Sequence, residues 1–147
     1  MSAGKLLGAS IAATMVGAAS AGFIIATGAV VLTSRSFEAN ALMIPFLGAL
    51  MGLVYGWIAS LGHVLLLGLP AYLLISRRGV PSRWGAGLAG FIIGFFPSSV
   101  FFWSEAPGQD PMAFDSWSFP LAFGLAGALA GLSFVAVMRG DDAGTPI

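Results

Sequence analysis

The sequence predicts an all-α integral membrane protein, a bundle of four transmembrane helices with both termini cytoplasmic. Of 147 residues, 58% are apolar and 8% are charged, whereas about a quarter of an ordinary soluble domain is charged. The mean hydropathy is +0.95. The apolar residues form long tracts between short polar segments, and roughly 20 such residues are needed to cross the hydrocarbon core.

The composition also excludes several classes of protein. Six Lys/Arg and six Asp/Glu give a formal net charge of zero, which provides no basic face for nucleic acid and too few charges to cover a soluble enzyme. Cysteine is absent, so disulfides, thiolate metal sites and cysteine nucleophiles are excluded. The lipid bilayer is therefore the first expected partner.

Four spans are expected in a single transmembrane domain, residues 1–147. They cover about 6–32, 41–65 with a kinked extension to 75, 84–103 and 119–138. The second tract is too long for one straight crossing, because 35 residues would extend about 52 Å as a helix, and too short for two. Pro70 lacks a backbone donor and clashes with the preceding turn, which predicts a kink near it.

The charges orient these spans. Positive residues favour the cytoplasmic side of short loops. With both termini inside, five of the six basic residues are cytoplasmic and only Arg35 is outside; the five are Lys5, Arg77, Arg78, Arg83 and Arg139. Trp84 and Trp103 bracket the third span, where amphipathic rings prefer the headgroup level.

Small residues recur every four positions in each span. In the first they are Ser10, Thr14, Ala18, Gly22 and Ala26; in the others they are Gly48, Gly52, Gly56 and Ser60, then Ala86, Gly90, Gly94 and Ser98, then Gly127 and Gly131. Residues four apart share a helix face, and small residues let helix backbones approach closely in lipid. The strips predict close helix packing, either within the chain or against another subunit or copy.

His63, Ser98 and Ser99 form a possible polar site within the membrane. His63 is the one readily ionisable side chain inside a span, where such groups are often functional. It could relay protons, ligate a haem or chlorin, or contact a lipid headgroup. The structural alternative is a neutral ring bonded to a backbone carbonyl or to a hydroxyl of another span. Ser98 and Ser99 follow Pro97, whose kink their hydroxyls could stabilise.

The sequence lacks the side chains that transporters and hydrolytic enzymes need. No Asp, Glu, Lys or Arg lies inside a span, which argues against a proton-coupled transporter or a small multidrug exporter. The lone membrane histidine and the loop carboxylates do not make a Ser-His-Asp set. We therefore expect a protein that is not an enzyme, with no catalytic residue, cofactor or metal site.

A stretch from His63 to Leu74, followed by Arg77-Arg78-Gly79, Trp84 and Ala89-Gly90, resembles small four-span bacterial inner-membrane proteins of unknown function. The resemblance lies around residues 63–90. It implies a multi-pass protein of the bacterial cytoplasmic (inner) membrane and implies no activity.

The function expected from these features is non-catalytic and depends on helix packing. The leading hypothesis is an accessory subunit of a larger membrane complex, with other membrane protein subunits as partners. One alternative is a homo-oligomeric pore or small channel, in which copies of the chain pack together. A second is a membrane-embedded immunity protein that binds the transmembrane helices of a toxin.

Overall fold

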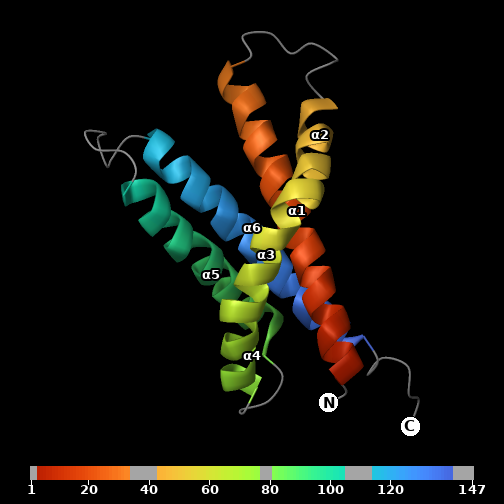
Figure 1. Ribbon diagram of the computed structural model, residues 1–147. Coiled ribbons are helices and arrows are strands. Elements are labelled where there is room, and N and C mark those ends of the chain that lie inside the picture. The colour runs from red at the N-terminus through yellow and green to blue at the C-terminus, as the bar shows by residue number, and fades with distance from the viewer. Residues whose placement is uncertain (1–2, 34–42, 77–80, 105–113, 141–147) are drawn as a thin grey trace.

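The computed structural model describes residues 3–33, 43–76, 81–104 and 114–140 (Figure 1). Within these ranges every residue is helical except 81, 82 and 140, which confirms the all-helical fold class for the described part of the chain. The elements are α1 (Ala3–Thr33), α2 (Met43–Met51), η2 (Gly52–Gly56), α3 (Trp57–His63), η3 (Val64–Gly68), α4 (Leu69–Ser76), α5 (Arg83–Ser104) and α6 (Phe114–Arg139).

Three helical segments among the described residues are long and apolar enough to cross a membrane: Ala3–Val31, Met43–Ser76 and Trp117–Arg139. They indicate a membrane protein. α5 has 22 residues, which is long enough to cross, but it is not among the three. Arg35, Arg77 and Arg78, which the topology prediction uses, lie outside the described residues.

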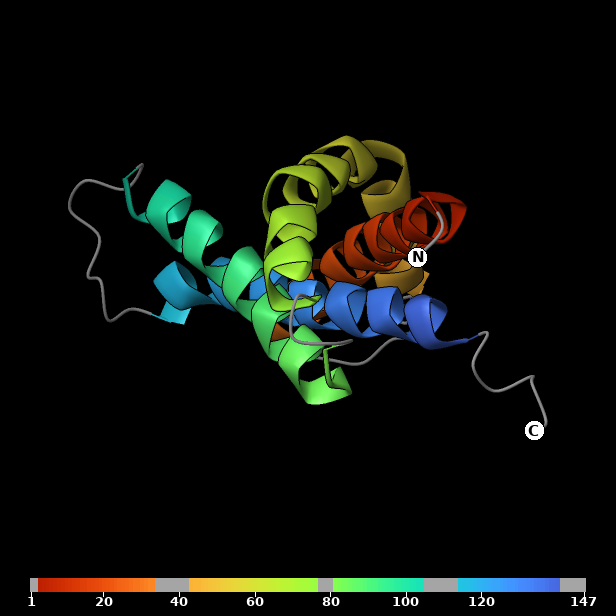
Figure 2. The ribbon, with the colours of Figure 1, turned by 90° about the horizontal axis from the view of Figure 1, so that it is seen from below.

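The second span is one bent helix, which we define as Met43–Ser76. Two π-helical turns interrupt it: η2 at Gly52–Gly56 and η3 at Val64–Gly68. The second turn ends two residues before Pro70, whose missing N–H and bulky ring disturb the preceding turn. The first turn contains no proline and has no signal in the sequence. Figure 2 shows the resulting curvature of the bent helix.

Helix α6 lies at the centre of the bundle. Its largest interface is with α5, and the next is with α1, which in turn packs against α2 (Figure 1). In the most hydrophobic stretch of each span, 39% of the α6 residues are buried, against 6% in the bent helix. The bent helix therefore forms a peripheral arm, held mainly through α1.

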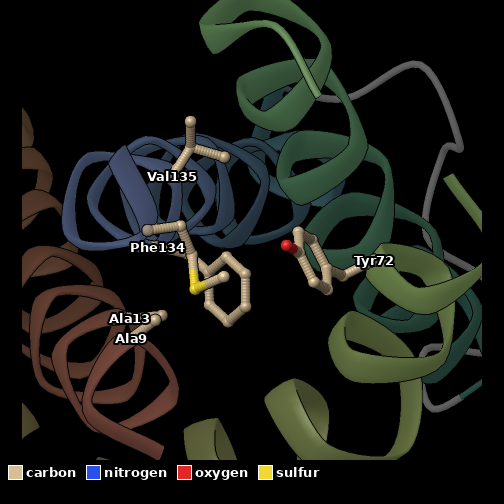
Figure 3. Close-up of a cluster of buried hydrophobic side chains, with 6 residues drawn as sticks. Ala9, Ala13, Tyr72, Phe134 and Val135 are labelled. Atoms are coloured by element: carbon tan, nitrogen blue, oxygen red, sulfur yellow. The ribbon is translucent and has the colours of Figure 1, made fainter. Parts of the chain in front are cut away.

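The buried core is small and lies near the end of the bundle where α1 begins and α6 ends. It comprises Ala9 and Ala13 of α1, Tyr72 of α4, and Phe134, Val135 and Met138 of α6 (Figure 3). The rings of Tyr72 and Phe134 meet edge to face, with their centroids 4.9 Å apart, an arrangement favoured by the ring quadrupoles. This contact ties the far end of the bent helix to α6.

Candidate functional site

Glycines bring the backbones of α1 and the bent helix into contact. A Cβ built on Gly22 would lie 2.9 Å from the carbonyl carbon of Gly48 and 3.1 Å from Cα of Gly52. A Cβ on Gly52 would lie 3.2 Å from the carbonyl carbon of Ala18 and would overlap its oxygen. Real Cβ atoms essentially never approach so closely. Only glycine fits at these crossing points, because any side chain would push the backbones apart.

The other two members of the strip on the bent helix pack less tightly against α1. A Cβ on Gly56 would meet only the Cβ of Ala18, at an ordinary 3.9 Å. Ser60 lies beyond this point and contacts α1 through its hydroxyl. The four positions therefore face α1, but the gap between the helices widens from Gly48 toward Ser60.

A second set of glycines joins α5 to α6. Cβ atoms built on Gly90 and Gly127 would each overlap the backbone carbonyl of the other residue, and one on Gly131 would lie 3.0 Å from the carbonyl carbon of Ala86. A Cβ on Gly94 would lie 2.9 Å from the carbonyl carbon of Phe123. The strips on these two helices thus pack against each other within the chain.

Aromatic rings extend the contact between α5 and α6. Phe95 stacks on Phe91 and on Trp117, with centroids 5.5 Å and 6.1 Å away. A Cβ on Gly124 would lie 2.8 Å from the ring of Phe91, so this glycine makes room for the ring. The four-residue spacing did not identify Gly124, whose contact with a ring of α5 depends on the tertiary fold.

Ser60 makes a hydrogen bond between two spans. Its hydroxyl donates to the carbonyl oxygen of Thr14 on α1 at 3.1 Å. Interhelical hydrogen bonds in lipid contribute on average about 0.6 kcal/mol and at most about 1.7 kcal/mol. Ser60 therefore links α3 to α1 next to Gly17, where a Cβ would lie 3.0 Å from the Ser60 Oγ.

We expect Ser60→Ala to lower the free energy of unfolding by about 1 kcal/mol. The measurement is the SDS midpoint of unfolding in mixed micelles, followed by tryptophan fluorescence. Ser20→Ala is the control, because the Ser20 hydroxyl bonds only to carbonyls of its own helix, those of Val16 and Gly17. Equal losses in both variants would contradict the assigned role of the Ser60 bond.

A half-open apolar cavity of about 860 Å³ lies between the bent helix and the other three helices. Its walls come from all of the described helices. The small residues of the predicted strips that line it are Ala18, Gly22, Gly52, Gly56, Ser60, Ala86, Gly90, Gly94, Ser98, Gly127 and Gly131, whereas Ser10, Thr14, Ala26 and Gly48 do not.

His63 and Ser98 both line this cavity, whereas Ser99 does not. The Nδ1 atom of His63 lies 2.9 Å from the carbonyl oxygen of Ala59 in its own helix. A carbonyl only accepts, so Nδ1 carries the proton in this arrangement. The ring is exposed to the cavity and is not hydrogen-bonded to Ser98. The structure thus places two of the three predicted polar residues in one cavity without joining them.

The hydroxyls after Pro97 bond within α5. Ser98 donates to the carbonyl oxygen of Gly94 at 2.6 Å, and Ser99 to that of Phe95 at 2.7 Å. Neither bonds to the carbonyl of Ile93, which is the one that Pro97 leaves without its usual helical donor. The hydroxyls of both serines are thus satisfied within their own helix.

Arg139 bonds to a residue at one end of the cavity lining. Its Nη2 donates to the carbonyl oxygen of Pro81 at 2.8 Å, and Pro81 lines the cavity. Ser82 caps α5 next to it, since its Oγ accepts from the backbone N–H of Gly85 at 3.0 Å. The sequence identified Arg139 only through its position after an apolar span, and the contact with Pro81 depends on the tertiary fold.

Among the described residues, no group of three or more His, Asp or Glu side chains could hold a metal ion. No family model, curated protein or solved structure matches this chain. The site is therefore defined by its own geometry: two glycine-mediated helix pairs, and an apolar cavity between them with a basic residue at one end.

Proposed function

We propose that this chain is a non-catalytic, four-span protein of the bacterial cytoplasmic membrane that acts through helix packing as an accessory subunit of a larger membrane complex. In this proposal α5 is the fourth span, and both termini are cytoplasmic. The proximity of Ala9 and Met138, near the start of α1 and the end of α6, supports this topology, because an even number of crossings returns the chain to the same side.

The observation that carries the proposal is the exposure of the bent helix. Only 6% of its most hydrophobic stretch is buried within the chain. Its outward side chains are large and apolar, including Leu47, Leu50, Val54 and Ile58, all of them exposed. A partner that covered this helix would gain close packing over several turns, which is the main source of helix association in lipid.

The glycine strips of the described helices already have packing partners within the chain. The glycines of α5 and α6 contact each other, and those of α1 contact the bent helix. Such internally satisfied strips do not need a second copy of the chain. The cavity is lined almost entirely by apolar side chains, which offer an ion no ligands. Both features favour an accessory subunit over a homo-oligomeric pore.

We expect native mass spectrometry of the protein, gently extracted from its own membrane, to give an assembly that contains foreign chains. The matched variants are Val54→Trp on the bent helix and Leu125→Trp on α6, whose wild-type side chains are similarly exposed (55% and 50%). Val54→Trp should release the foreign chains, because the larger ring blocks close packing, and Leu125→Trp should retain them.

The other outcomes contradict the proposal. A single mass near 15.0 kDa would show a lone bundle, and a multiple of this mass without foreign chains would favour the pore. Loss of the partner in Leu125→Trp but not in Val54→Trp would place the interface on α6 and reject docking on the bent helix.

A further inference from the structure

We propose that the cavity is a binding site for one anionic phospholipid, with an acyl chain inside the cavity and the phosphate beside Arg139 and Arg83. The inference does not rest on the accessory-subunit proposal. It follows from the size, length and lining of the cavity and from the charges at one end.

The cavity suits an acyl chain in volume and lining. At about 860 Å³ it falls within the roughly 300–1,000 Å³ typical of pockets that hold small ligands. Its walls are apolar except for a few groups such as Ser60, His63 and Ser98. An apolar cavity does not hold ordered water, because water needs several polar partners. A flexible hydrocarbon chain from the bilayer can fill it.

The length of the cavity also matches one leaflet. Along α5 its lining runs from Ala86 to Ser98, a rise of about 18 Å for 12 residues at 1.5 Å each. Half of a hydrocarbon core of about 30 Å is about 15 Å. A lipid whose headgroup lies at one end of this lining would therefore extend its tail along the whole of it.

The charged residues indicate at which end of the cavity the lipid headgroup lies and that the headgroup is anionic. Pro81 lines the cavity at the end of the bundle where α5 begins and α6 ends. Arg139 bonds to Pro81 through one Nη2 donor, and a guanidinium has five N–H donors. Arg83 lies two residues beyond Pro81 and is exposed. No acidic residue lies among residues 81–100, and the two that follow Arg139 in the sequence, Asp141 and Asp142, are outside the described residues. Arg139, which bonds to the lining residue Pro81, and Arg83, two residues from Pro81, are two cations next to one end of an apolar cavity. They complement an anionic phosphate headgroup attached to an apolar tail.

The test is the number of lipids retained by the full chain in native mass spectrometry, after reconstitution in vesicles that contain equal amounts of phosphatidylglycerol and phosphatidylcholine. We expect one phosphatidylglycerol per chain in the wild type. Arg83→Gln should reduce the preference for phosphatidylglycerol about fivefold, as expected for one cation at a membrane surface, and Arg139→Gln by at least as much. Arg83 is exposed, so its substitution leaves the packing intact.

Three glycines of the bent helix provide a matched test of the cavity itself. Gly56 and Gly68 line the cavity, and a Cβ on either meets only ordinary contacts, at 3.9 Å and 3.8 Å. Gly62 lies between them, outside the lining, with nothing within 4 Å of its Cβ position. We expect Gly56→Leu and Gly68→Leu, separately or together, to reduce lipid retention about tenfold, and Gly62→Leu to leave it unchanged.

Several results would overturn the inference: equal retention of the two lipids by the wild type, equal loss in Gly56→Leu and Gly62→Leu, or bound detergent without phospholipid. The tryptophan emission of each variant is recorded so that loss of fold is recognised, and the arginine variants give an independent readout. A monomer that retains one phosphatidylglycerol would reject the accessory-subunit proposal and support this one.

Discussion

Gly90→Ala is expected to destabilise the bundle by about 2 kcal/mol or more. The added Cβ would lie 2.8 Å from the carbonyl carbon of Gly127 and would overlap the oxygen. Backbone atoms cannot move aside as a flexible side chain can, so α5 and α6 must separate along the largest interface of the bundle. Overpacking of this kind costs about 1–3 kcal/mol, which exceeds the gain of up to about 1 kcal/mol in helix propensity from glycine to alanine.

Gly87→Ala provides the control on the same helix. Its Cβ would lie 3.5 Å from the side chain of Leu132, an ordinary van der Waals distance. The higher helix propensity of alanine then dominates, and we expect an unchanged or slightly raised SDS midpoint in mixed micelles. Equal midpoints for Gly90→Ala and Gly87→Ala would show that the close approach of Gly90 and Gly127 does not stabilise the fold.

Gly22→Ala is expected to detach the bent helix from α1 while α5 and α6 stay paired. The new Cβ would lie 2.9 Å from the carbonyl carbon of Gly48 and 3.1 Å from Cα of Gly52. The bent helix has few other contacts with the chain, so the loss is concentrated there, again about 2 kcal/mol. Hydrogen exchange of residues 43–56 should rise, because local opening of this segment becomes easier.

Gly28→Ala on the same helix is the comparison for this second prediction. Nothing lies within 4 Å of its Cβ position, so the exchange of residues 43–56 should match the wild type. Faster exchange throughout α5 and α6 in Gly22→Ala would contradict the proposed independence of the two helix pairs. The Gly22→Ala variant would then unfold as one cooperative unit.

Much of the helical architecture can be predicted from the sequence because each helix is determined locally. A run of apolar residues in lipid must satisfy its backbone within one helix, and polar segments such as the one around Arg35 interrupt the runs. The kink near Pro70 has a local cause as well. The π turn at Gly52–Gly56 could not be predicted in this way, because no single residue there prevents an ordinary α-helical turn.

The candidate site could be predicted only in part. The spacing of Gly90, Gly94 and Gly127 suggested close packing, but four-residue spacing does not identify the partner of a strip. The contact of Gly90 with Gly127, and of Gly22 with Gly48 and Gly52, depends on which helices are neighbours. The contact of Tyr72 with Phe134 had no sequence signal, since Tyr72 lies in an apolar run that could equally face lipid.

The sequence by itself determined the helical class, the apolar character of the spans and the places where small side chains let backbones approach. These properties belong to one helix at a time, through hydropathy, backbone hydrogen bonding and the period of 3.6 residues. Only the tertiary structure decided which strips pair, where Ser60 and Arg139 donate their hydrogen bonds, and that the bent helix leaves a cavity of about 860 Å³ beside α5 and α6. Those features depend on how far apart two helices lie along their whole length, and a cavity arises from what several helices jointly fail to fill.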